Sequence, residues 1–290
     1  MSATPLTWGG RSIPAPGGLP AVAVSLTGPS LAQARSQARS AIDAGADVLE
    51  LRVDLLEETG ALAAPDPLDA ATAAAQVLEC LRGLGEIIAA DGADAGAGAP
   101  LLLTCRTAAE GGRAHLDDTA YGSLLRSVLD GLTDWTPERR PAAIDVEVQR
   151  GCLPQVCAQA HALSIDVVAS FHDFEATPAD EALEEVLARM AREGADLAKI
   201  AVWPTTADDV ARLLGVCARA TAGAGEGADL GVPVAAMSMG ALGAVSRVAP
   251  AFGSALTFAV VPDGQGQSRA SAPGQLPLQD VRRCLELLRA

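Results

Sequence analysis

Eight short apolar runs recur along the chain from residue 20 onward, each bounded by Pro, Gly or charged residues. They are apolar on both alternating faces, which is typical of strands buried on both sides of a parallel sheet. The predicted strands are 21–26, 47–54, 101–107, 143–148, 166–172, 196–203, 233–239 and 255–261.

Stretches with helical character follow each of these strands. Several begin with a cap or a proline, as at Thr177 and Pro178, and several end in glycine. The predicted helical stretches are 30–44, 67–91, 117–132, 152–164, 178–194, 206–222, 241–251 and 277–289.

Eight strand–helix units over residues 20–290 predict an α/β fold, a single-domain (β/α)8 TIM barrel. A doubly wound open sheet is the alternative. It is less favoured because the first strand is followed by SLTGPSLAQ and not by a G-x-G-x-x-G fingerprint. Residues 1–19 form a leader that we expect to close the lower end of the barrel. Two Ala/Gly/Asp tracts, 89–100 and 222–231, are expected to be loops on the face away from the chemistry.

The charge balance narrows the choice of partners. The formal net charge is −15, which argues against nucleic acid or an anionic membrane as the main partner. No apolar run is long enough to suggest a membrane span, and the N-terminus does not resemble an export signal. The six cysteines are scattered without a C-x-x-C pair, as in a reducing cytosol, so we expect a cytoplasmic protein.

Polar side chains gather at the carboxyl ends of the predicted strands, where barrels place their catalytic groups. Each has an ordinary structural explanation when taken alone, but together they converge on one end of one barrel. These residues are Glu50, Arg52, Asp54, Arg106, Glu110, Asp145, Glu147, His172, Asp173, Lys199, Met237, Ser238 and Arg247. After the last strand, the loop SRASAPGQL at 268–276 is long enough to act as a lid.

Lys199 is the only lysine in the chain, and it lies inside an apolar run. Desolvation and nearby arginines are expected to push it toward the neutral amine, which can form an imine with a ketone or aldehyde. His172, one strand–helix unit earlier, can take and return the proton that the iminium makes acidic. Arginines suggest a carboxylate or phosphate on the substrate, and paired acids suggest hydroxyls. Without a metal-like cluster or a cofactor motif, these residues predict a metal-free Schiff-base lyase or aldolase for a small anionic polyol ketone.

The motifs ELRVD, CRTAAEGG, IDVE, SFHDF-x-x-TP, LAKIA, MSMG…SR…FGSALTFA and ASAPGQL occur in this order. Together they resemble type I 3-dehydroquinate dehydratase from about residue 20 to the C-terminus. The resemblance implies dehydration of 3-dehydroquinate to 3-dehydroshikimate by syn elimination, without a cofactor, in the shikimate route or in quinate breakdown. It also implies a homodimer.

The resemblance assigns roles to individual residues of this sequence. Lys199 would form the imine, His172 would transfer the protons, and Glu110 would orient His172. Arg247 would hold the substrate carboxylate. The other substrate-binding positions implied are Glu50, Arg52, Arg106, Met237, Ser271 and Gln275. Phe171 stands where tyrosine is common in the family.

Two other functions are compatible with these residues. The lysine and histidine alone would also suit a class I aldolase that breaks a carbon–carbon bond. A catalytically silent barrel that binds a ligand is the second, although the intact polar set argues against it.

Overall fold

The computed structural model describes residues 4–64, 69–90, 99–222, 230–261 and 270–289. Each of the eight predicted apolar runs overlaps one strand of the barrel almost completely, which confirms their prediction from the sequence. The strands are β3 (Ala21–Leu26), β4 (Val48–Arg52), β5 (Leu101–Thr104), β6 (Ala143–Glu147), β7 (Asp166–Asp173), β8 (Leu197–Val202), β9 (Val234–Ser238) and β10 (Leu256–Val260).

Strands β3 to β9 pair in sequence order and in parallel, and β10 returns to pair with β3. The remaining gap lies between β9 and β10, where the Ala255 amide donates to the Val234 carbonyl at 2.7 Å. A short strand, β11 (Leu276–Pro277), pairs with the end of β10 on the side away from β3. The chain therefore forms the predicted (β/α)8 barrel, and the last part of the lid loop is tied to it.

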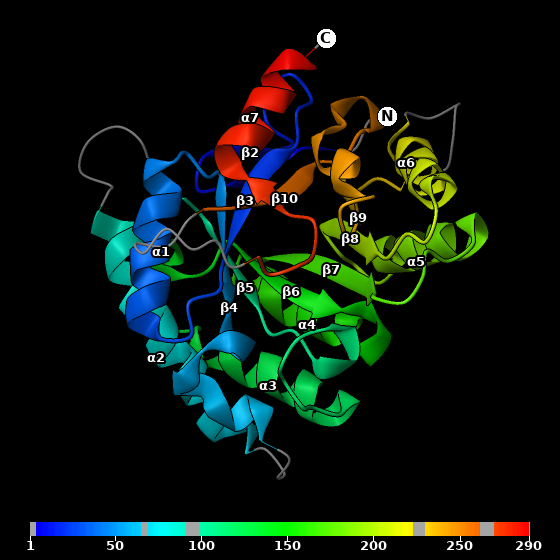
Figure 1. Ribbon diagram of the computed structural model, residues 1–290. Helices are drawn as coiled ribbons and strands as arrows, with labels where there is room; N and C mark the ends of the chain where they lie inside the picture. The colour runs from blue at the N-terminus through cyan, green and yellow to red at the C-terminus, as the bar shows by residue number, and fades with distance from the viewer. Residues whose placement is uncertain (1–3, 65–68, 91–98, 223–229, 262–269, 290) are drawn as a thin grey trace.

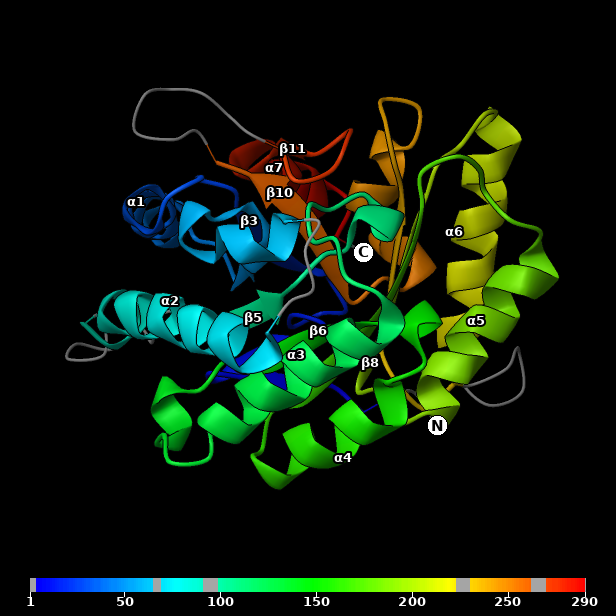
Figure 2. The same cartoon turned by 90° about the horizontal axis from the view of Figure 1, so that it is seen from below.

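Seven α-helices of the described residues surround the strands (Figures 1 and 2). They are α1 (Leu31–Asp43), α2 (Ala70–Ala90), α3 (Asp118–Gly131), α4 (Leu153–Ala162), α5 (Asp180–Arg192), α6 (Ala207–Thr221) and α7 (Leu278–Leu287). None of these helices is both long and apolar enough to cross a membrane, as far as the described residues go.

The helix expected at 241–251 is instead two 3₁₀ turns, Ala244–Val248 and Pro250–Phe252. Pro250 disfavours α-helical geometry in the residue before it and offers no N–H to a continuing helix. Gly253 then ends the second turn with a φ of 82°. This tight segment brings Arg247 against the barrel mouth.

The barrel interior has an apolar lower part. Inward-facing residues such as Val48, Leu102 and Val168 form one cluster with Trp8 and Ile13 of the leader. The leader contributes a small hairpin of β1 (Leu6–Trp8) and β2 (Arg11–Ile13). The Trp8 indole N–H donates to Asp166 Oδ2 at 2.7 Å. The hairpin is thus packed and bonded at the amino ends of the strands.

The two Ala/Gly/Asp tracts fall mostly outside the described residues, which omit 91–98 and 223–229.

Candidate active site

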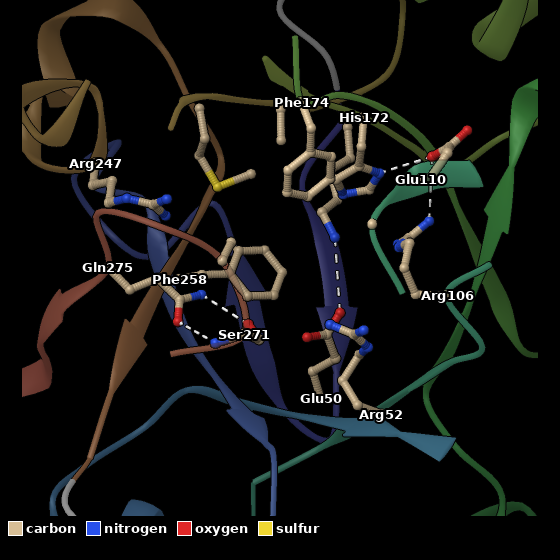
Figure 3. Close-up of a pocket in the computed structure, with 15 residues that line it drawn as sticks. Glu50, Arg52, Arg106, Glu110, His172, Phe174, Arg247, Phe258, Ser271 and Gln275 are labelled. Atoms are coloured by element: carbon tan, nitrogen blue, oxygen red, sulfur yellow. Dashed lines mark hydrogen bonds and ion pairs between the residues drawn. The ribbon is translucent and has the colours of Figure 1, made fainter. Parts of the chain in front are cut away.

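A pocket opens at the carboxyl end of the barrel (Figure 3). All ten residues to which the family resemblance assigned a role line it. The empty space between its walls, counted together with the open solvent at its mouth, is about 460 Å³. The lining residues are Glu50, Arg52, Arg106, Glu110, Gly111, His172, Phe174, Lys199, Ala201, Met237, Arg247, Phe258, Ser271, Ala272 and Gln275.

Lys199 points into the barrel because alternate residues of β8 share its inner face. Its side chain is buried, and Nζ lies 3.5 Å from Asp145 Oδ2 and 3.7 Å from Glu50 Oε1. Nζ also lies 4.5 Å from the ring centroid of Phe258. The charged partners of the amine are therefore two carboxylates. This differs from the arginine surroundings expected from the sequence, because Asp145 and Glu50 project inward from β6 and β4 at the same level.

His172 lies on the neighbouring strand β7 and bonds through Nδ1 to Glu110 Oε2 at 2.9 Å. Burial lowers the pKa of His172 well below 6.5, and the positive charges of Arg106 and Lys199 act in the same direction. The imidazole is therefore neutral at neutral pH and able to accept a proton. Burial raises the pKa of Glu110, and the positive charge of Arg106 opposes this by lowering it.

Glu50 and Arg52 share the inner face of β4, as their spacing predicted. Arg52 makes two parallel bonds to Asp54, at 2.8 Å and 2.7 Å. Glu50 accepts hydrogen bonds from Thr104 Oγ1 at 3.0 Å and from Ser25 Oγ. Both side chains are held in place while still lining the pocket.

Arg247 comes from the first 3₁₀ turn after β9 and is 2% exposed. Its Nη2 donates to the Pro273 carbonyl of the lid at 3.1 Å, while Nε has no hydrogen-bond partner. Among the described residues no carboxylate forms an ion pair with it. Burial lowers its pKa from 12.5 to about 10. A buried guanidinium without a counter-charge is a site prepared for an anion.

The lid loop is joined to the pocket through hydroxyl and amide groups. Ser271 Oγ donates to Ser25 Oγ at 2.8 Å, and Gln275 Nε2 donates to Ser271 Oγ at 2.9 Å. Ser25 in turn bonds to Glu50. Ser271, Gln275 and Arg247 lie across the pocket from His172, Glu110 and Arg106 (Figure 3).

Within the described residues no group of three His, Cys, Asp or Glu is arranged to hold a metal ion.

Comparison with known proteins decides the family. The family model described as type I 3-dehydroquinase matches residues 22–290. The chain belongs to the type I 3-dehydroquinase family. A relative from Lactiplantibacillus plantarum, named 3-dehydroquinate dehydratase, is 36% identical over 276 residues, covering 93% of each chain. A Salmonella agona relative with the same name is 36% identical, covering 93% of this chain and 94% of its own.

Solved structures agree with this membership. The Geobacillus kaustophilus 3-dehydroquinate dehydratase superposes with a TM-score of 0.79 at 28% identity, covering 99% of this chain and 97% of its own. The type I enzyme of Clostridium difficile, carrying covalently modified comenic acid, has the same TM-score and identity, with 99% and 98% covered. The barrel predicted from the sequence is thus the fold of the family.

Three residues that were not among the predicted site residues have side chains in contact with the predicted ones. Phe258 lies against the amine, and the Phe174 ring stacks on His172 with centroids 6.5 Å apart. Ser25 links Glu50 to the lid. A lone phenylalanine or serine, on a strand or just after one, carries no mark of function. The one sequence signal was that Phe174 lies in the motif SFHDF and Phe258 in the motif FGSALTFA, both of which resemble the family.

Gly111 is required beside Phe174. Its φ is +81°, and a Cβ there would lie 2.3 Å from the Phe174 ring. The glycine after Glu110 therefore lets the aromatic ring approach the mouth of the pocket.

Proposed function

We propose that the protein dehydrates 3-dehydroquinate to 3-dehydroshikimate through an imine on Lys199. The observation that carries this proposal is the content of one pocket: a buried lysine side chain, a neutral imidazole, and a buried guanidinium that forms no ion pair with the described carboxylates. Membership of the type I 3-dehydroquinase family supports the same reaction.

In the first step Lys199 Nζ gives up a proton and attacks the substrate ketone as an amine, and the carbinolamine loses water to give an iminium. Asp145 and Glu50 are placed to accept a proton or to balance the cation, at 3.5 Å and 3.7 Å from Nζ. The ring face of Phe258 also favours positive charge on this nitrogen.

In the second step His172 removes a proton from the carbon next to the iminium and leaves an enamine. The bond from Nδ1 to Glu110 leaves Nε2 for this transfer. The enamine then expels the hydroxyl from the following carbon, and the imidazolium protonates it so that it departs as water. Hydrolysis of the conjugated iminium frees the enone product and Lys199. Glu110 orients the imidazole throughout.

Substrate binding uses the remaining polar groups. Arg247 pairs with the substrate carboxylate, which supplies the counter-charge that the described residues lack. Glu50 and Arg52 face the hydroxyls of the ring, and Met237 supplies an apolar contact. Ser271 and Gln275 close over the ligand as part of the lid.

Further properties are proposed with this function. The protein would act in the cytoplasm as a homodimer in the shikimate route. The leader, residues 1–19, would close the lower barrel end, which the burial of Trp8 and Ile13 supports. Sedimentation velocity would test the dimer, since a monomeric mass at micromolar concentration would contradict it.

The direct test is the absorbance of the conjugated enone formed from 3-dehydroquinate. An increase in that absorbance, lost in Lys199→Met, would support the proposal. Cleavage of a sugar phosphate without dehydration would favour an aldolase. Binding of 3-dehydroquinate without turnover would favour a silent barrel.

A further inference from the structure

We propose that Arg106 is the positioning residue that couples the two catalytic groups, because its guanidinium holds both the carboxylate facing Lys199 and the carboxylate holding His172. The inference rests on the proposed function and deepens it. It gives Arg106 a task that differs from the substrate binding implied by the family resemblance.

The link to Lys199 runs through Asp145, which is 0% exposed. Arg106 Nη2 donates to Asp145 Oδ1 at 2.8 Å, and Ser170 Oγ donates to the same oxygen at 2.7 Å. The other oxygen, Oδ2, lies 3.5 Å from Lys199 Nζ. One side of the carboxylate is thus fixed so that its second oxygen faces the amine.

The link to His172 runs through Glu110. Arg106 Nη1 lies 3.5 Å from Glu110 Oε2, the same oxygen that lies 2.9 Å from His172 Nδ1. The other oxygen, Oε1, has no hydrogen-bond partner. Glu110 therefore depends on Arg106 and His172 for its orientation, and loss of the guanidinium would free it to turn.

Arg106 itself is held rigidly. Its side chain is 4% exposed and Nη1 also bonds to Ser170 Oγ at 2.8 Å and to Glu147 Oε1 at 3.2 Å. Its backbone N–H donates to Asp54 Oδ1 at 3.2 Å. Gly112 packs directly against the Arg106 backbone, since a Cβ added at Gly112 would lie 2.1 Å from the Arg106 carbonyl oxygen. Because both the backbone and the guanidinium of Arg106 are held by these contacts, its side chain has little freedom to move with a ligand. This rigidity fits a role in positioning Asp145 and Glu110.

The charge of Arg106 acts on the same groups as its geometry. After burial, Arg106 is the main influence on the pKa of His172, Glu110 and Asp145, and it lowers all three. A neutral residue at this position would therefore raise the pKa of His172. The other charged groups facing His172 are Glu110, Lys199 and Arg52.

The test compares Arg106→Lys and Arg106→Gln with the native enzyme and with Arg189→Lys, a control on helix α5 whose arginine pairs with Glu193. Two steps are followed separately. Borohydride trapping of 3-dehydroquinate reports imine formation on Lys199. Washout of deuterium from the carbon next to the ketone reports proton transfer by His172.

We expect Arg106→Lys to slow both steps at least about 10-fold with little change in KM, because an ammonium cannot hold both carboxylates in a fork. In the pH profile of kcat/KM, the acid limb of Arg106→Lys should stay at the native pH because the positive charge is kept. The acid limb of Arg106→Gln should move to higher pH because the charge that lowers the pKa of His172 is lost. If Arg106→Gln fails to fold, the Lys variant alone decides the question.

A raised KM with both steps at native rates would overturn the proposal in favour of direct substrate binding. Slowing of only one step would also overturn it. Failure of the proposed function would look different, since the native enzyme itself would then form no trapped adduct.

Discussion

Replacing Arg247 by methionine is expected to stabilise the free protein and to weaken the enzyme. Burial lowers the pKa of Arg247 from 12.5 to about 10. At about 1.4 kcal/mol per pH unit, holding the charge in the empty pocket costs about 3 kcal/mol. The lost bond to the Pro273 carbonyl offsets about 1.5 kcal/mol of this. A net gain of about 1.5 kcal/mol would raise Tm by about 3 °C.

The effect on catalysis should be larger and of opposite sign. The carboxylate of 3-dehydroquinate would enter a buried site without its partner, at a cost of about 2–5 kcal/mol. This corresponds to a loss of about 30- to 5,000-fold in kcat/KM, most of it in KM. Calorimetry and steady-state absorbance kinetics measure the two effects. Arg247→Lys is the matched control, since it keeps a cation and should retain more of the affinity. A methionine variant with native kcat/KM would refute the reasoning about the anion site.

The other predictions concern the imidazole and the lower barrel end. His172→Ala should still trap substrate on Lys199 while kcat falls about 100- to 10,000-fold, and native turnover would remove His172 as the base. Because the pKa of His172 is lowered well below 6.5, kcat/KM should show no acid limb near pH 6.5, whereas a limb there would show a normally titrating histidine. As the pH falls below 6.5, His172 is protonated in the unfolded chain before it is protonated in the folded protein, so the free energy of unfolding should fall. The His172→Gln variant should lose part of this pH dependence. Trp8→Ala should cost about 3–5 kcal/mol of stability with kcat unchanged, and a large loss of kcat would contradict a purely structural leader.

Strand positions could be predicted from the sequence because a parallel barrel buries both faces of each strand. The run at 21–26 coincides with β3, β7 extends one residue beyond the run at 166–172, and the other runs contain their strands with one to three extra residues. The helix expected at 241–251 was wrong because its spacing resembles a helix, whereas Pro250 and Gly253 stop continued α-helical bonding. The spacing of apolar residues does not show whether such backbone constraints or tertiary packing decide the local structure.

The pocket residues could be predicted because strand ends in a barrel converge. Their partners could not, since contacts across the barrel depend on which residues lie at one level. The sequence suggested arginines around Lys199, but β6 and β4 place Asp145 and Glu50 there. The link from Ser25 to Ser271 joins residues 246 positions apart, and no local signal marks such a pair.

The central claim is that the single lysine of this chain forms an imine with 3-dehydroquinate. Borohydride reduction of the turning-over enzyme, followed by peptide mass spectrometry, tests it most directly. We expect a stable adduct carrying the carbon skeleton of the ligand on the peptide that contains Lys199, and none in Lys199→Met. Full activity without any mass increase on that peptide would contradict the imine mechanism.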